Sequence, residues 1–371
     1  MSFTHSLPCI RAAWALALPS LVPSTMIHAA PSELGQHPLC EASAAIVVPC
    51  PGGSEQCLLV GDNEQRQSLF LFKIDNGQVQ AQSQQEVELD LRKATELSDI
   101  EALTLLPDGK IAVFASHSRN TRCEAKENRR RFGVIDHLSP TSTKLSIFAS
   151  RGICCGCMFD ADSRADPLVT AVCETIDDAE RQADVIGNRA TNGTVDEEAA
   201  KEQCNQVLPY NAEGAVNLAS SGQPDVWIGL RAPLLGTHPV DSARKDLAIL
   251  LHLKGMDAYT FDGLALLDMD GRGVRDLTLA DGWVWVIAGP PDDLPNGSTE
   301  PFELRRFPVD GLAKGEIIET EVIDHDLPTS AEGLAILDGR AIIVIDGDDG
   351  GEGATKCKTS SGVISQPMPK P

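Results

Sequence analysis

The sequence has few aromatic residues and little positive charge. Aromatic side chains make up only 4% of the 371 residues, so Val, Ile, Leu and Ala must supply most of a core. Lys and Arg number 31 against 54 Asp and Glu, which gives a formal net charge of −23. Phosphate backbones and anionic lipids repel such a chain. We therefore expect neither nucleic acid nor a membrane as a partner, and expect a small molecule, a cation or an unidentified protein instead.

Long hydrophobic runs are missing after the first thirty residues, so no later segment is expected to span a bilayer. The first thirty hold a short apolar run at 12–18, Arg11 before it, no acidic residue, and small residues at Ala29 and Ala30. This pattern is typical of a secretory signal. We predict that residues 1–30 are a signal peptide and that the mature chain is exported, to the periplasm or outside the cell.

Eleven cysteines are present, and ten remain after the predicted signal peptide. An even number in an exported chain favours disulfides. The connectivity stays open, but we expect Cys357 to pair with a cysteine in the region 40–57 or near another loop. The cluster at 154–157 could alternatively bind a soft metal, although no second Cys-x-x-Cys or His pair lies at a matching spacing.

A pattern of two short apolar runs joined by a turn recurs along the chain and predicts β-hairpins. Four copies cover 98–119, 211–231, 274–289 and 331–348, and further strands are expected at 45–48, 57–60, 69–74, 247–253 and 302–307. Such continuous apolar runs suit strands that are buried on both faces. We predict an all-β fold, a β-propeller of about six blades, with five or seven as alternatives and a β-sandwich array as the rival.

Spacing and composition also divide the chain. The long interval between the first two hairpins predicts a degenerate blade around 150–210, and the polar, Ala-rich stretch 174–206 predicts a small helical or loop insertion. The propeller domain is expected to cover residues 31–356. Residues 357–371 are expected to form a flexible C-terminal tail.

Acidic residues stand at the start of the predicted inner strands, where a propeller would bring them to one mouth of its channel. Converging carboxylates repel each other unless a cation or arginines neutralise them. Calcium is one candidate, with Glu101, Glu213 and Glu332 as its ligands, and otherwise no cofactor is expected. Structural pairing with arginines that hold the blades together is the alternative. The candidate residues of the channel mouth are Asp99, Glu101, His117, Glu213, Arg231, Arg275, Asp276 and Glu332.

Catalytic signals are weak. No Gly-x-Ser-x-Gly elbow is present. His117 between two serines, with Asp99 to orient it, could belong to a serine hydrolase, or simply to a hydrogen-bond network at a strand end. The acidic stretch 346–350 resembles part of a calcium loop but is also typical of a solvated turn. The basic run 129–131 is expected to pair with nearby acids.

Five segments taken together resemble the bacterial family known as domain of unknown function 3616. They are SDIEAL at 98–103, SHSR at 116–119, GLRAP at 229–233, GRGVRD at 271–276 and AEGL at 331–334. The resemblance covers residues 95–350, with NAEGA at 211–215 and the cysteine-rich segment near 154 as departures. It implies a propeller-like fold, with a more distant similarity to phytase-like and esterase-like propellers whose channel acids bind calcium, and it implies no particular activity.

Three functions therefore stay open at the sequence level. The first is an exported propeller that binds a small ligand, a cation or a partner at its channel mouth. The second is a calcium-dependent hydrolase of phosphate or carboxylic esters. The third is a protein-binding scaffold without catalysis. No residue is assigned as catalytic.

Overall fold

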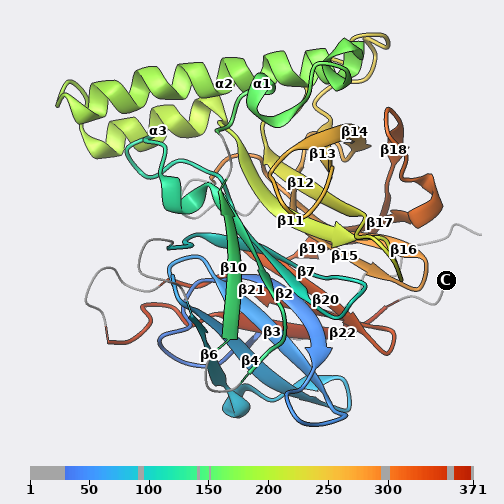
Figure 1. The fold of residues 1–371 in the computed structure, drawn as a ribbon. Helices are drawn as coiled ribbons and strands as arrows, with labels where there is room; N and C mark the ends of the chain where they lie inside the picture. Colours follow the sequence, from blue (N-terminus) through green and yellow to red (C-terminus); the bar gives the residue numbers. More distant parts are fainter. Residues whose placement is uncertain are drawn as a thin grey trace, which may run out of the picture.

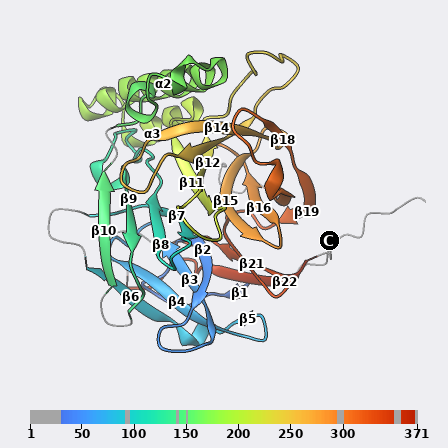
Figure 2. The same cartoon turned by 45° about the vertical axis from the view of Figure 1, so that its right-hand side comes forward.

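The computed structural model describes residues 30–90, 96–139, 143–149, 152–293, 301–348 and 355–368 (Figures 1 and 2). Residues 1–29, and with them nearly all of the predicted signal peptide, lie outside the described residues. None of the helices in the described part of the chain is long and apolar enough to cross a membrane.

Five groups of four strands, here called blades 1 to 5, make up the fold, and the last strands of blades 1 and 2 also pair in parallel, so these two blades share one sheet. Each is an antiparallel meander in which consecutive strands pair, apart from blade 5, where the first strand of the chain lies beside the last. The first two blades comprise β2 (Ala42–Pro49), β3 (Gln56–Asp62), β4 (Ser68–Asp75) and β6 (Gln85–Asp90), then β7 (Ile100–Leu105), β8 (Ile111–Ala115), β9 (Arg131–Ile135) and β10 (Thr143–Ala149). Blades 3 to 5 comprise β11 (Asn211–Asn217), β12 (Val226–Ala232), β13 (Ala248–Leu253) and β14 (Phe261–Asp268), then β15 (Gly273–Ala280), β16 (Trp283–Gly289), β17 (Phe302–Pro308) and β19 (Glu321–Leu327), then β20 (Ala331–Leu337), β21 (Arg340–Ile345), β22 (Gly362–Pro367) and β1 (Ser32–Glu33).

Short elements extend this framework. Two short strands pair at blade edges, β5 (Gln78–Val79) with β4 and β18 (Ile317–Glu319) with β14. Short 3₁₀ helices lie at Ala81–Ser83, Glu127–Arg129, Ser163–Ala165 and Val309–Gly311.

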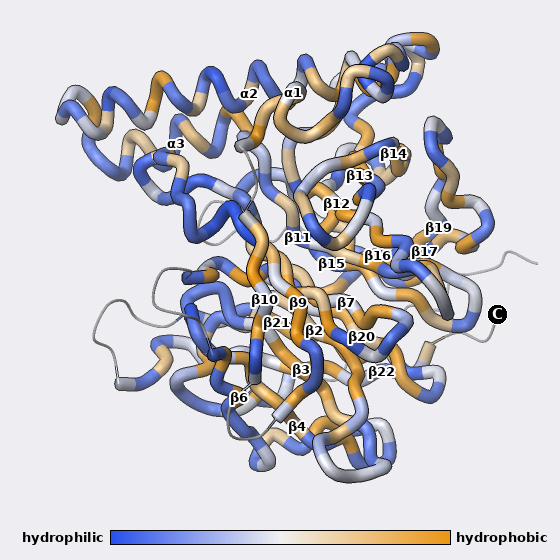
Figure 3. The backbone as a smooth tube through the Cα atoms, in the orientation of Figure 1, coloured by the Kyte–Doolittle hydropathy of each residue, from blue (hydrophilic) through white to orange (hydrophobic). Residues whose placement is uncertain are grey.

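The five blades form a closed ring, which makes the fold a β-propeller. The inner strands β2, β7, β11, β15 and β20 pack against one another in this order, and β20 returns to β2. A separate cluster of buried apolar side chains lies between each pair of neighbouring blades. The strands are therefore buried on both faces, as their continuous apolar runs predict, and Figure 3 shows them as hydrophobic segments joined by polar loops.

The blade number differs from the expected six, although five was an alternative. The reason is the segment that was expected to hold a degenerate blade around 150–210, which instead forms α1 (Cys155–Met158), α2 (Pro167–Thr191) and α3 (Glu197–Val207). The expected insertion at 174–206 is helical. Asp166 caps the first turn of α2 and Pro167 occupies its first position, both of which favour helix initiation. The helices lie together on one side of the propeller (Figure 1).

Ion pairs around the buried Glu180 fasten α2 to blade 2. Glu180 on α2 lies 2.8 Å from Arg119 and 3.1 Å from Arg130, and Asp184 lies 2.8 Å from Arg119. All these acids belong to the helix and both arginines belong to the loop between β8 and β9. The expectation that the basic run pairs with nearby acids is met by Arg130 here.

The expected flexible tail at 357–371 is wrong over much of its length. Residues 362–367 form β22, which pairs along its whole length with β21 and also with β1. Cys357 forms a disulfide with Cys40. The Ser- and Pro-rich composition hid a strand whose Val363 and Ile364 are buried in blade 5.

All ten cysteines from Cys40 onward are paired. The bonds are Cys40–Cys357, Cys50–Cys57, Cys123–Cys204, Cys154–Cys157 and Cys155–Cys173. The predicted disulfides are thus present, and the alternative of a soft-metal site at 154–157 is wrong because those sulfurs are bonded to one another or to Cys173. Five disulfides indicate an oxidising compartment and hence export.

Candidate functional site

Each inner strand contains a β-bulge close to its first residue, and β11 has a second register shift between Asn211 and Ala212. The pairing with the second strand of the blade skips one residue, and the skipped residues of blades 1 to 5 are Ser43, Glu101, Glu213, Arg275 and Glu332. A bulge turns the side chain of its extra residue away from the regular alternation of the strand. We call these five equivalent residues the bulge ring. The ring contains the three glutamates that the sequence places at equivalent positions.

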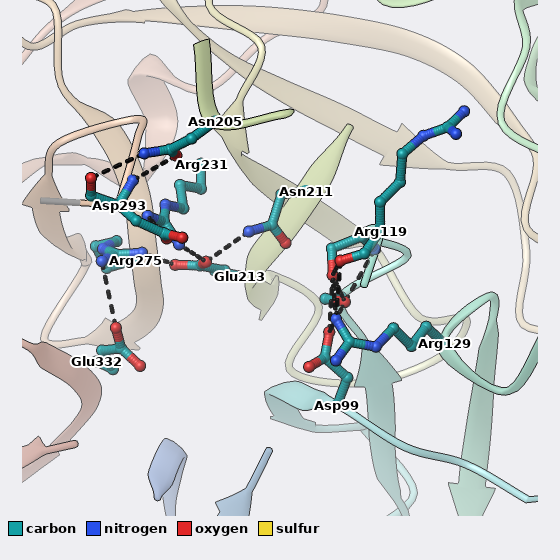
Figure 4. Close-up of polar contacts among 12 residues, drawn as sticks. Asp99, Arg119, Arg129, Asn205, Asn211, Glu213, Arg231, Arg275, Asp293 and Glu332 are labelled. Carbon is teal, nitrogen blue, oxygen red and sulfur yellow. Dashed lines mark hydrogen bonds and ion pairs between the residues drawn. The ribbon is translucent and has the colours of Figure 1, made fainter. Parts of the chain in front are cut away.

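Arg275 joins three blades through its guanidinium. Its Nη1 lies 2.6 Å from Glu213 Oε2 and its Nη2 lies 3.3 Å from Glu332 Oε1 (Figure 4). Its guanidinium carbon lies 5.0 Å from the centre of the Phe302 ring. Because these three charged groups are almost fully buried, the pairs hold neighbouring inner strands in register around the axis.

Glu213 has two further partners on its own blade. Arg231 Nη1 lies 3.1 Å from its Oε1, and the Asn211 amide donates to the same oxygen at 2.8 Å. Arg231 also reaches Asp293, at 2.7 Å through Nη2. The arginines that the sequence offered as alternatives to a cation are therefore the groups that neutralise Glu213 and Glu332.

Glu101 differs from the other charged members of the ring. It is 7% exposed, and across the described parts of the chain no hydrogen bond or ion pair reaches its carboxylate. Burial raises its pKa well above the ordinary value, and the charges of Asp99 and Glu213 raise it further. Burial likewise raises the pKa of Glu332 to about 7, against the lowering effect of Arg275. Glu101 is thus a carboxyl group without a counter-ion in an acidic setting.

Asp99 lies beside Glu101 in the sequence and is held in a separate network. Arg129 Nη1 lies 3.1 Å from Asp99 Oδ2, Ser118 donates to the same oxygen at 2.9 Å, and Ser116 donates to it as well. Figure 4 shows this network apart from the cluster around Glu213. Arg129 was not among the candidate residues, although the acids around it made its pairing foreseeable.

His117 does not belong to the channel mouth. It is fully buried, its ring stacks on Tyr259 at 3.8 Å, and its Nδ1 lies 2.8 Å from the carbonyl oxygen of Ala115. Burial lowers its pKa to about 3. Since the neighbouring serines bind Asp99 and the imidazole does not, the hydrolase interpretation of this segment is wrong. The left-handed backbone of His117, at φ 59°, turns its ring into the aromatic core.

Asp276 was expected at the mouth and instead fastens two blades. Its carboxylate is 1% exposed and accepts hydrogen bonds from the backbone of Leu277 at 2.7 Å and of Leu334 at 2.6 Å. The bulge in β15 puts Arg275, and not Asp276, at the position equivalent to the glutamates. Burial raises the pKa of Asp276 well above its ordinary value.

A pocket of about 320 Å³ opens at the mouth next to Glu101 and Glu213. One wall is α3, which is tied to blade 2 by Cys123–Cys204 and to the segment after β16 by paired hydrogen bonds between Asn205 and Asp293 at 2.7 and 2.9 Å. The remaining polar side chains that line it are Asn63, Glu64, Asp99, Ser118, Arg119, Asn120, Thr121, Arg129, Lys201, Asn211 and Arg231. The pocket is polar and carries charges of both signs.

Two amide oxygens in the pocket have no hydrogen-bond partner among the residues that the structure describes. Asn63 Oδ1 and Asn211 Oδ1 are buried without a hydrogen bond in the described residues. The Asn211 amide is oriented by its donation to Glu213, so its oxygen is free to accept. Sequence reasoning missed Asn63 and Asn211. Asn63 directly follows the end of β3, and Asn211 lies two residues before the bulge residue Glu213. Neither position stands out in the amino-acid composition.

The predicted calcium ligands do not form a calcium site. Glu213 and Glu332 both face Arg275, so a guanidinium occupies the position between them that an ion would need. Within the described ranges, no group of three or more Asp, Glu, His or Cys side chains is arranged to hold a metal ion. Asp346 and Asp348 fall in the acidic stretch 346–350, and Asp348 pairs with Lys358 at 2.7 Å.

Comparisons of the sequence with known protein families and curated proteins do not assign the chain to a family. No protein-family model matches the chain, and no curated protein matches it, so the resemblance to domain of unknown function 3616 stays a prediction.

Several solved structures are similar in fold. PhoX of Pseudomonas fluorescens in complex with vanadate, a transition state analogue, is 11% identical over 89% of both chains, with a TM-score of 0.41. An exo-β-1,3-galactanase from Phanerochaete chrysosporium with β-1,3-galactotriose is 11% identical over 91% of this chain and 63% of its own, with a TM-score of 0.44. A GH43 β-1,3-galactosidase with galactodeoxynojirimycin is 10% identical over 91% and 93%, with a TM-score of 0.45. At these TM-scores the similarity carries no argument about the site.

Proposed function

We propose that this protein is an exported binding protein whose channel-mouth pocket takes a small ligand with a primary ammonium group. The observation that carries the proposal is the carboxylate of Glu101, which lines the pocket. Glu101 is only 7% exposed and has no counter-ion in the described chain. A buried carboxyl group of this kind is costly for the fold, and a cation beside it would offset that cost.

The hydrogen-bonding capacity of the pocket fits an ammonium group. An ammonium has three donors and no acceptor. Glu101, Asn63 Oδ1 and Asn211 Oδ1 are acceptors that line the pocket, and all three lack a partner in the described residues. A guanidinium or a quaternary ammonium would fill these acceptors less well, the first because it is planar and the second because it has no N–H.

The surrounding charges support the same ligand class. The carboxylates of Asp99, Glu213 and Glu332 act on Glu101, and the three arginines nearby are each engaged by one of these acids or by Asp293. The pocket volume of about 320 Å³ lies at the lower end of small-molecule sites, so the ligand is small.

The other two functions have less support. A calcium-dependent hydrolase needs a metal site, and the arginine between Glu213 and Glu332 stands against the set of ligands that was expected for it. A pure scaffold would not need a buried carboxyl group facing a pocket. Thermal unfolding with Ca²⁺ and with a chelator tests the hydrolase, because an ion bound in the folded state would raise the melting temperature.

Isothermal titration and thermal shift with putrescine, ethanolamine and spermidine test the proposal directly. Tetramethylammonium serves as the matched ligand control, because it carries the charge without an N–H donor. We expect at least one primary amine to bind the wild-type protein above pH 7, and Glu101→Gln to weaken that binding by about tenfold or more. Glu88→Gln, at an exposed position on β6, is the matched control and should bind like the wild type. No binding of any amine, or equal binding by Glu101→Gln, would overturn the proposal.

A further inference from the structure

The Cys154–Cys157 disulfide stands apart from the other four in its surroundings. It alone, among the disulfides of the described residues, joins two half-buried cysteines. In each of the others at least one cysteine is no more than 3% exposed, as for Cys40, Cys57, Cys123 and Cys173. Both residues of this bond are thus partly exposed, which favours access by an external thiol.

Fold stability does not account for this bond. Disulfides stabilise mainly by restricting the unfolded chain, and the effect grows with the length of the loop that they close. Cys154 and Cys157 are only three residues apart, whereas Cys155 and Cys173 are separated by 18 residues and already tie α1 to α2. The Cys-x-x-Cys spacing is also the one at which thiol pKa values are commonly lowered.

The neighbouring residues suit exchange at these sulfurs. Gly152 faces Cys157, since a Cβ at this glycine would lie 3.5 Å from Cys157 Sγ, and the missing side chain leaves that sulfur uncovered on this side. The backbone of Gly152, at φ 133°, favours glycine. Gly156 lies between the two cysteines in the sequence, and a Cβ placed on it would be 3.7 Å from a guanidinium nitrogen of Arg164. Arg164 thus brings a positive charge next to Gly156 of the short loop that the disulfide closes, and a cation near a cysteine favours its thiolate.

We infer that Cys154–Cys157 is a thiol–disulfide exchange site for a small external thiol. The thiolate of the small thiol attacks Cys157 Sγ, the bond to Cys154 breaks, and Cys154 leaves as a thiolate. A second thiol then attacks the external sulfur of the mixed disulfide and releases the Cys157 thiolate. Two thiols are oxidised to one disulfide, and the protein pair gains two electrons and, after protonation, two protons. The reverse reaction reduces a small-molecule disulfide to two thiols and re-forms the bond between Cys154 and Cys157.

Graded reduction of the intact protein with glutathione tests the inference. Samples are quenched with N-ethylmaleimide and the labelled cysteines are located by peptide mass spectrometry, with circular dichroism as a check on the fold. We expect Cys154 and Cys157 to be labelled about tenfold faster than Cys50 and Cys57, the other short-range pair, while the remaining bonds stay intact. Glutathione should be trapped on Cys157 in preference to Cys154.

Variants of Arg164 separate exchange chemistry from simple accessibility. In the pre-reduced pair, Arg164→Gln should shift the pH profile of Cys154 alkylation to higher pH, and Arg164→Lys should restore it, because the cation and not the packing acts on the thiolate. The inference fails if Cys154 and Cys157 are labelled no faster than Cys50 and Cys57, or if all five disulfides are reduced together as the protein unfolds. It also fails if Arg164→Gln leaves the pH profile unchanged.

Discussion

Arg275 occupies in blade 4 the position that Glu101 occupies in blade 2, since each is the extra residue of the bulge near the start of its inner strand. The two side chains nevertheless have opposite surroundings. Arg275 is paired with Glu213 and Glu332, while Glu101 has no ionic partner in the described chain. The bulge ring thus contains both a structural cluster of ion pairs and an acid that has no ionic partner in the described chain and lines the pocket.

Removing the guanidinium of the bulge ring should destabilise the fold strongly. Arg275→Met would leave Glu213 with only its second arginine and Glu332 without this partner, both in buried positions. We expect a loss of about 3–5 kcal/mol in the free energy of unfolding. Denaturant unfolding measures it. Arg66→Met is the control, because Arg66 forms an exposed pair with Glu96 at 3.7 Å, and it should change stability by less than about 1 kcal/mol. Equal losses in the two variants would contradict the buried cluster.

Glu332 should make the protein less stable as the pH rises. Its pKa is 4.5 in the unfolded chain and about 7 in the folded one, chiefly because of burial. Between these values the folded state holds a proton that the unfolded state has released, so the stabilisation is complete below the lower pKa and is lost as the pH rises through the upper one. Glu332→Gln should reduce the stability difference between pH 5 and pH 8 by about 1–3 kcal/mol, measured by urea unfolding. An unchanged difference would show that Glu332 does not titrate in this range.

His117 should act in the opposite direction on the acid side. Burial lowers the pKa of His117 from 6.5 to about 3. Between these two values the imidazole is protonated in the unfolded chain and neutral in the folded chain. Stability contributed by the neutral imidazole is present above the upper pKa and is lost as the pH falls toward the lower one. His117→Asn fits the left-handed backbone and does not titrate. We expect this variant to be less stable at pH 7, because the stacking on Tyr259 is lost, but to lose less further stability between pH 6.5 and pH 4 than the wild type.

The bond between Cys40 and Cys357 should matter more than any short-range disulfide. It spans 317 residues, against seven for Cys50–Cys57. Replacing Cys40 and Cys357 together by Ser should cost about 3–5 kcal/mol, and replacing Cys50 and Cys57 should cost less. Differential denaturant unfolding of the two double variants under oxidising conditions gives the comparison. A larger loss from the short-range pair would show that strain or packing outweighs the restriction of the unfolded chain.

Much of the architecture could be predicted because the local signals for strands are strong. The hairpins at 98–119, 211–231, 274–289 and 331–348 fall on the inner two strands of blades 2 to 5, and the strands expected at 45–48 and 57–60 belong to blade 1. The blade number could not be read from spacing alone, since a helical insertion and a degenerate blade occupy similar lengths of chain.

The candidate site was predicted in part. Glu101, Glu213 and Glu332 share a sequence context of an acid followed by Ala or Gly, and the small residue is needed where inner strands approach closely, as a Cβ at Gly333 would lie 3.1 Å from Ala45. The register error between Arg275 and Asp276 arose because a bulge shifts the period of a strand by one residue and leaves no mark in the composition. His117 was misplaced for a related reason, since a positive φ at one residue is not visible in an apolar pattern.

Blade 5 contains strands from both ends of the described chain, and this limits the order in which the fold can form. β22 near the C-terminus must pair with β1 near the N-terminus before blade 5 is complete and the ring can close. An exported chain that emerges from its translocation channel N-terminus first would present four blades with two open edges until its final residues arrive. Ring closure therefore has to wait for the last strand of the chain, and until then the unpaired edges would be the part of the chain that most needs protection from aggregation.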